Sequence, residues 1–236
     1  MKQKNHLRYL AHSDYYFDEI FSVWDRHMQS KEELCELFNA IDSEEEKDLF
    51  LRIGAYYKYL VVKGGYQFPD KILNQGMSYI DETYKYIAIF SLIEALETPP
   101  KYCDFYKWLQ DRKNLSLPFN QKIKAVLDEQ YQEYKKEYGS TRAAVRFFER
   151  LDDKDKEIMI QKIQIDGDVD GSLKKISQLL YDIRSKFVHN AQIILSFGAG
   201  TSIGYDEKGK VLVNKLTMND LCTFFERGFL KRFGWK

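Results

Sequence analysis

Apolar side chains recur every three or four residues along most of this chain, which is the spacing that places them on one face of an α-helix. Over 14–28, the apolar residues Phe17, Ile20, Phe21 and Trp24 follow this spacing and predict a helix. The same spacing predicts further helices in a segment that begins after Ser30 and over 43–62, 69–98, 101–112, 119–138, 141–150 and 153–163. Most of the chain is therefore expected to be helical.

Two serines indicate where helices begin. Glu33 follows Ser30 by three positions, and Glu46 follows Ser43 by the same interval, which is the capping-box pattern. Gly64 and its neighbour are predicted to end the helix that Ser43 begins. The segment 69–98 has apolar residues on most sides, which predicts a buried central helix that ends before a Pro-Pro pair.

The last third of the chain changes in texture. A turn-rich stretch at 166–171 precedes a predicted helix from Ser172 to Leu195. Short, largely apolar segments at 203–205 and 211–213 then flank a charged, glycine-containing turn, which predicts a hairpin. A closing helix is predicted over 217–233.

These elements together predict an all-α helical bundle with one small β-hairpin near 202–215 and no strand outside that region. The division into domains is weakly marked. We expect an N-terminal helical accessory region over 1–65 and a main helical domain over 66–236, and the alternative is one continuous domain.

Composition narrows the classes of function. The 236 residues include 36 Lys plus Arg and 36 Asp plus Glu, so the formal net charge is zero and general electrostatic attraction to nucleic acid is not indicated. A local basic surface is still compatible with this total. One candidate is the set of cations near the C-terminus, namely Arg227, Lys231, Arg232 and Lys236.

The cysteines and the apolar runs bear on location and cofactors. Cys35, Cys103 and Cys222 are odd in number and far apart, which argues against a disulfide framework or a zinc site. We expect no metal and no cofactor. The N-terminus lacks an apolar signal core, and no apolar run is long enough to span a bilayer, so a cytoplasmic protein without membrane contact is expected.

The main chemical signal lies in the predicted helix 172–195. Arg184 and His189 stand five positions apart, and they pair a phosphate-binding cation with a group that moves protons near neutral pH. An apolar stripe runs along this helix through Ile176, Leu180, Ile183, Phe187, Ala191 and Ile194. At about 100° per residue, His189 falls about 160° from the centre of the stripe and Arg184 about 60° from it. His189 should therefore face solvent or a partner chain.

The wording around this pair, YDIRSKFVHN over 181–190, resembles the Arg-x4-6-His signature of HEPN domains. It is closest to the ApeA-like branch, in which a Tyr-Asp-x-Arg-Ser-Lys-x-Val-His run is typical. The resemblance implies a helical domain that dimerises, so that two motifs face one another across a cleft. Many members of the superfamily are ribonucleases, often in defence against phage, and others are inactive or bind nucleotides.

The resemblance also implies roles for individual residues. His189 would act as general base or acid, and Arg184 would bind the phosphate while the ribose 2′-OH attacks it without a metal. Ser185 stands where many ribonuclease members have Asn, Asp or His, and its hydroxyl could orient the imidazole or be an ordinary surface group. Lys186 and Asn190 would contact RNA, although Asn190 could equally serve to end the helix.

An acidic residue on an earlier helix is a further expected feature of the superfamily. Glu94 is the preferred candidate and Glu97 the alternative, since either could pair with Arg184, and both could also be solvated helix residues.

The leading hypothesis is thus a homodimeric, metal-independent endoribonuclease that acts on RNA in phage defence or a toxin system. An unidentified partner is expected to regulate it. The alternative is a non-catalytic HEPN protein that binds RNA or nucleotide, or serves as an assembly module.

Two other signals are weaker. The acidic stretch 166–171 begins like a calcium loop, but the twelfth position holds Ser177 instead of the required glutamate. Glycines at 198, 200 and 204 match no phosphate-binding pattern, and a flexible connection is the preferred interpretation.

Overall fold

The protein is represented by a computed structural model, which describes residues 7–65, 74–98, 104–105, 108–109, 123–167, 172–190, 195–198, 200–206 and 209–235. Its main helices are α1 (Ser13–Trp24), α2 (Lys31–Asn39), α3 (Glu44–Tyr57), α4 (Asn74–Glu97), α6 (Ile123–Tyr138), α7 (Ser140–Glu149), α8 (Asp153–Gln161), α9 (Leu173–Asn190) and α10 (Met218–Arg232). A π-helical turn, Lys58–Val62, extends α3. The strands are β1 (Ile163–Ile165), β2 (Ser202–Tyr205) and β3 (Val211–Asn214).

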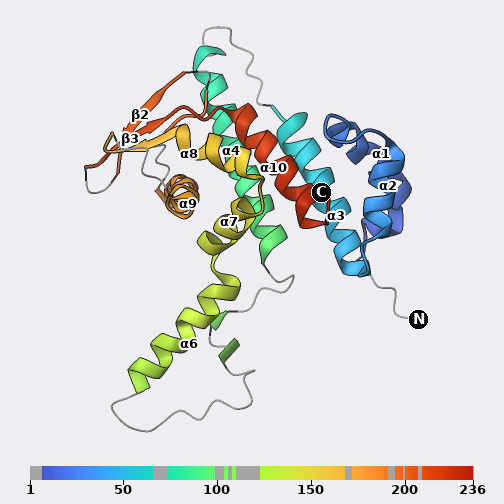
Figure 1. Cartoon of the computed structure of the whole chain (residues 1–236), viewed down its shortest axis with the longest axis horizontal. Coiled ribbons are helices and arrows are strands. Elements are labelled where there is room, and N and C mark those ends of the chain that lie inside the picture. The colour runs from blue at the N-terminus through green and yellow to red at the C-terminus, as the bar shows by residue number, and fades with distance from the viewer. Residues whose placement is uncertain are drawn as a thin grey trace.

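The predicted all-α class with a small hairpin is confirmed (Figure 1). Both predicted N-caps are also present, because the Ser30 and Ser43 hydroxyls accept the backbone N–H groups of Glu33 and Glu46, each at 3.3 Å. In a capping box, the Glu33 carboxylate would accept the backbone N–H of Ser30. Here it accepts the backbone N–H of Gln29 instead, at 2.7 Å. Most of the helix predicted over 101–112 lies outside the described residues.

Three boundaries differ from the prediction. Strand is not confined to 202–215, because β1 pairs antiparallel with β3 and gives the sheet order β1-β3-β2. Ile163 is therefore the first residue of a strand instead of the end of the preceding helix. Helix α9 ends at Asn190, and Leu195, predicted to close it, is a buried non-helical residue. At Ile163, pairing with β3 overrides the local helical spacing.

Helix α4 occupies the centre of the molecule. Its side chains Tyr86, Ile89, Phe90, Ile93 and Leu96 are all at most 3% exposed, which confirms the predicted buried helix. Figure 1 shows α4 behind α10 and α7, with α1–α3 on one side and the sheet with α8 and α9 on the other, while α6 projects from the body. The apolar core is one cluster that includes side chains from α1 to α4 and from α7 to α10.

A buried carboxylate joins the N-terminal helices to α10. Glu226 is 2% exposed, and it accepts hydrogen bonds from Arg26 Nε at 2.5 Å and from the Tyr57 hydroxyl at 2.6 Å. His27 Nε2 lies 2.6 Å from the same carboxylate. The Tyr57 ring stacks between Trp24 and Phe225, at centroid distances of 5.4 and 4.6 Å. Polar and aromatic contacts thus hold the two parts of the chain together.

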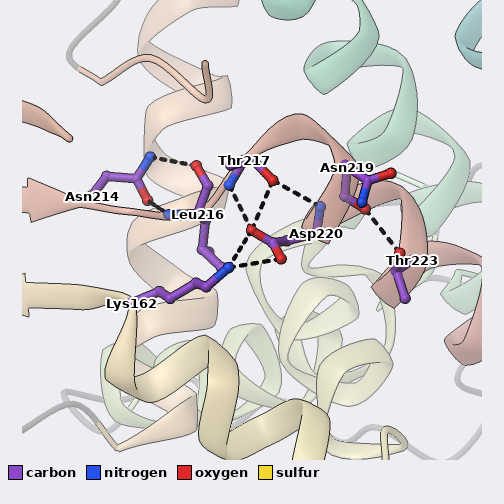
Figure 2. A network of polar contacts seen from close by, with 7 residues as sticks. All are labelled: Lys162, Asn214, Leu216, Thr217, Asn219, Asp220 and Thr223. Atoms are coloured by element: carbon purple, nitrogen blue, oxygen red, sulfur yellow. Dashed lines mark hydrogen bonds and ion pairs between the residues drawn. The ribbon is translucent and has the colours of Figure 1, made fainter. Parts of the chain in front are cut away.

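A second polar network holds the sheet against α10 (Figure 2). Lys162 Nζ donates to both carboxylate oxygens of Asp220, at 2.8 and 2.7 Å. Asp220 also accepts from the backbone N–H of Thr217, whose hydroxyl accepts the Asp220 N–H in a capping box. Asn214, which is fully buried, exchanges two bonds with the backbone of Leu216. The polar groups of these residues thus bond with one another, and the network positions α10.

Candidate functional site

Helix α9 carries the Arg-x4-His motif, and its apolar stripe faces the body of the protein. Ser172 caps the helix by accepting the Lys175 N–H at 3.3 Å. Ile176, Leu180 and Ile183 are at most 3% exposed and belong to the central core. The helix packs against α7, α8 and α4.

Arg184 forms an ion pair with Glu94 of α4. Its Nη2 donates to Glu94 Oε2 at 3.2 Å, and the two side chains are 16% and 22% exposed. Within the described part of the chain, Arg184 Nε and Glu94 Oε1 are buried without a hydrogen-bond partner. The pair therefore retains unused hydrogen-bonding capacity, which is uncommon for buried polar groups.

The structure distinguishes the two glutamates that the sequence left as alternatives. Glu97, one turn after Glu94, is bound by Arg150 through Nη1 at 2.5 Å and Nη2 at 3.0 Å. Arg146 also reaches Glu97, with Nη2 donating to its backbone carbonyl at 2.7 Å. Glu94 is therefore the partner of Arg184, and Glu97 anchors α7 to the end of α4.

Tyr181 is a member of this cluster that the sequence analysis did not assign to a role. The guanidinium carbon of Arg184 lies 5.7 Å from the centre of its ring, which is within the range of a cation–π contact. Burial raises the pKa of Tyr181; Glu94 adds to the rise, whereas Ser140 and Arg184 oppose it. The signal that could have identified it is the three-residue spacing to Arg184, which puts both residues on one helix face.

His189 is exposed, as its position opposite the stripe predicted. Its side chain makes no hydrogen bond or ion pair to any residue that the structure describes. Along an α-helix, five residues correspond to about 7.5 Å of rise and a rotation of about 140°. Within one straight α9, Arg184 and His189 therefore cannot approach the same phosphate from adjacent positions.

The remaining motif residues are Ser185, Lys186 and Asn190. Ser185 is half-buried, and among the described side chains it forms no hydrogen bond with His189, so the suggested orienting contact is not made here. Lys186 is half-buried on the same helix. Asn190 is the last residue that the structure describes in α9, and its side chain lies outside the described residues.

The cations near the C-terminus are occupied by carboxylates of the same chain. Arg227 Nη1 donates to Asp155 at 2.5 Å, Lys231 lies 2.8 Å from Asp152, and Arg232 donates to Glu46 at 3.1 Å. These pairs hold α10 against α8 and α3. The nucleic-acid interpretation of this segment is therefore not favoured, while Lys236 lies outside the described residues.

The described part of the chain contains no group of three or more His, Cys, Asp or Glu residues able to hold a metal ion. In the acidic turn, Asp166 accepts the Val211 N–H at 3.0 Å and pairs with Lys210 at 3.1 Å. Asp166 and Gly167 both have positive φ, 57° and 83°, as expected for a tight turn. Asp168 and Asp170 lie outside the described residues.

Comparison with known proteins adds no relative: no family model, curated protein or solved structure matches the chain. A helix sufficiently long and apolar to cross a membrane is absent from the residues that the structure describes. The features that indicate a function are therefore the Arg-x4-His motif of α9 and the positions of its side chains.

Proposed function

We propose that this protein is a metal-independent endoribonuclease whose active site is formed where two copies of α9 meet. The single observation that carries the proposal is the state of the motif pair. Arg184 is anchored by Glu94 at 3.2 Å in a partly buried position, whereas His189 on the same helix is exposed. One group is positioned to hold an anion, and the other is accessible to transfer a proton.

A second copy of the chain would bring a histidine to the phosphate that Arg184 holds. Because the two side chains diverge by about 140° along one helix, a phosphate held by Arg184 of one protomer is better served by a histidine from another. The exposure of Val188, at 48%, beside His189 supports this arrangement, because it leaves an apolar side chain available for contact. The resemblance to HEPN domains, many of which dimerise through this motif, points the same way.

The proposed reaction is an internal transesterification. His189 accepts the proton of the ribose 2′-OH as its oxygen bonds to the adjacent phosphorus. The bond from phosphorus to the 5′-oxygen of the next nucleotide breaks, and that oxygen takes a proton from an imidazolium or from water. The products are a 2′,3′-cyclic phosphate and a 5′-OH end. Arg184 stabilises the negative charge that builds on the phosphoryl oxygens.

A second candidate function is supported by a specific observation. Only 16% of the Arg184 side chain is exposed, and Ser185 makes no contact with His189. A motif in this state also suits a non-catalytic protein that binds RNA or nucleotide. Phage defence or a toxin system is the biological setting that the resemblance suggests for the enzyme.

The deciding experiment compares purified variants on a labelled, structured RNA pool in EDTA. His189→Ala and Arg184→Ala should each abolish cleavage, with the loss of acid–base catalysis alone costing about 10²–10⁴-fold in rate. Arg184→Lys should also be impaired, because an ammonium cannot make the planar two-pronged contact with phosphate. DNA of the same sequence should remain intact, since it lacks the 2′-OH.

His12→Ala provides a matched control, because His12 is exposed and lies on the N-terminal 3₁₀ turn far along the chain from the motif. This variant should cleave as the unmodified protein does. Equal cleavage by the His189→Ala protein would reject the proposed site. Failure of all proteins to cleave, with RNA still bound in a mobility assay, would favour the non-catalytic function.

A further inference from the structure

A cavity of about 400 Å³ lies where α3, α4, α6, α7 and α10 meet. Its volume is in the range of small-molecule sites. Leu49, Ala95 and Leu96 provide an apolar part of the lining. Arginines from three different helices, Arg52, Arg146 and Arg232, also line it. The cavity is separate from the motif site, because neither Arg184 nor His189 contributes to it.

Two of these arginines are already engaged. Arg146 donates from Nη1 to the Lys136 carbonyl at 2.8 Å and from Nη2 to the Glu97 carbonyl at 2.7 Å. Arg232 donates to Glu46 at 3.1 Å. Their positive charges are thus committed to holding the walls of the cavity together.

Arg52 differs from them. It is half-buried in α3, and its guanidinium makes no hydrogen bond or ion pair with any described residue. A partly desolvated cation that no described carboxylate pairs with is unfavourable, and a bound anion would offset that cost. A planar guanidinium suits a phosphate or a carboxylate, either of which it can bind through two N–H groups.

The other charges of the cavity limit the ligand further. Four glutamates also line it, namely Glu45, Glu46, Glu97 and Glu137. Glu46 and Glu97 are paired with Arg232 and Arg150, but the remaining acidic lining would repel a molecule with several acid groups. The apolar side chains of Leu49, Ala95 and Leu96 favour a ligand with an apolar body.

We propose that this cavity is a binding site for a small organic anion, with an apolar body and one terminal phosphate or carboxylate that Arg52 binds. The proposal stands apart from RNA cleavage, since it requires neither a dimer nor the motif residues. The acid group is the shared chemistry, and the experiment decides which of the two acids is preferred.

The test measures binding of naphthyl phosphate and naphthylacetate to the full chain by calorimetry, with naphthylacetamide as the uncharged analogue. At least one of the anions should bind saturably and more tightly than the amide. Arg52→Gln should weaken that binding by about ten- to a hundredfold, the factor expected when a hydrogen bond to a charged group is lost. Because Arg52 pairs with none of the residues that the structure describes, this variant should keep the fold and melting temperature of the unmodified protein.

Arg142→Gln is the matched control, because Arg142 is an exposed arginine of α7 that does not line the cavity. It makes the same change in net charge and should bind as the unmodified protein does. Equal binding of the amide and the anions, unchanged binding by Arg52→Gln, or no binding of either anion up to about 10 mM would each overturn the proposal.

Discussion

Replacing Tyr57 by phenylalanine tests whether the buried Glu226 network holds the N-terminal helices to α10. The hydroxyl of Tyr57 donates to Glu226 Oε1 at 2.6 Å, and the side chain is fully buried. Burial, with Cys222 and Glu226 as further causes, raises the pKa of Tyr57, so the hydroxyl keeps its proton and acts as a donor throughout the ordinary pH range. The substitution removes one oxygen and leaves the aromatic ring in its stack.

The expected loss of stability follows from this geometry. A hydrogen bond to a charged group contributes about 1.5–3 kcal/mol, and its removal here leaves a buried carboxylate with fewer donors. Arg26 and His27 still contact Glu226, so the loss should not reach the larger cost of an uncompensated buried charge. At about 2–4 °C per kcal/mol for a chain of this size, the melting temperature should fall by roughly 3–12 °C.

The assay is urea unfolding followed by circular dichroism, with thermal melts beside it. Tyr205→Phe is the matched control, since Tyr205 is 65% exposed and its hydroxyl has no hydrogen-bond partner among the described residues. This change should shift the free energy of unfolding by less than about 0.5 kcal/mol. If Tyr57→Phe proved as stable as Tyr205→Phe, the Glu226 network would not hold the N-terminal helices in place.

Three further outcomes are expected. Glu94→Gln should lower the free energy of unfolding by about 1–3 kcal/mol and reduce RNA cleavage because it releases Arg184, whereas Glu97→Gln should affect unfolding in urea but leave cleavage largely intact. For Asp220, burial acts to raise the pKa, but the bonds from Lys162 and the capping backbone outweigh burial and leave that pKa below its ordinary value. Its stabilising effect is therefore present above about pH 4 and is lost as the pH falls through the lowered pKa, so the deficit of Asp220→Asn in urea unfolding should be full at pH 7 and shrink in acid. Light scattering at micromolar concentration should show a dimer, and a strictly monomeric protein would count against the shared active site.

The sequence by itself determined the elements whose cause is local. Helical spacing and the serine caps at Ser30 and Ser43 predicted most helices, because both effects act over three or four residues. The hairpin also followed from a local alternation and its turn. The exposure of His189 could be predicted in the same way, since its angle from the apolar stripe depends only on helix geometry.

The tertiary structure decided what depends on neighbours distant in sequence. The three residues of β1 carry too short a pattern to predict a strand, and they form one because β3 supplies their hydrogen bonds. Glu94 and Glu97 are equally plausible partners of Arg184 in the sequence, and the packing of α4 against α9 and α7 distinguishes them. Five helices that lie far apart in the sequence line one cavity with Arg52, which pairs with no described residue, and only the fold shows this. Charge pairing depends on distance in space, which a local pattern of residues does not specify.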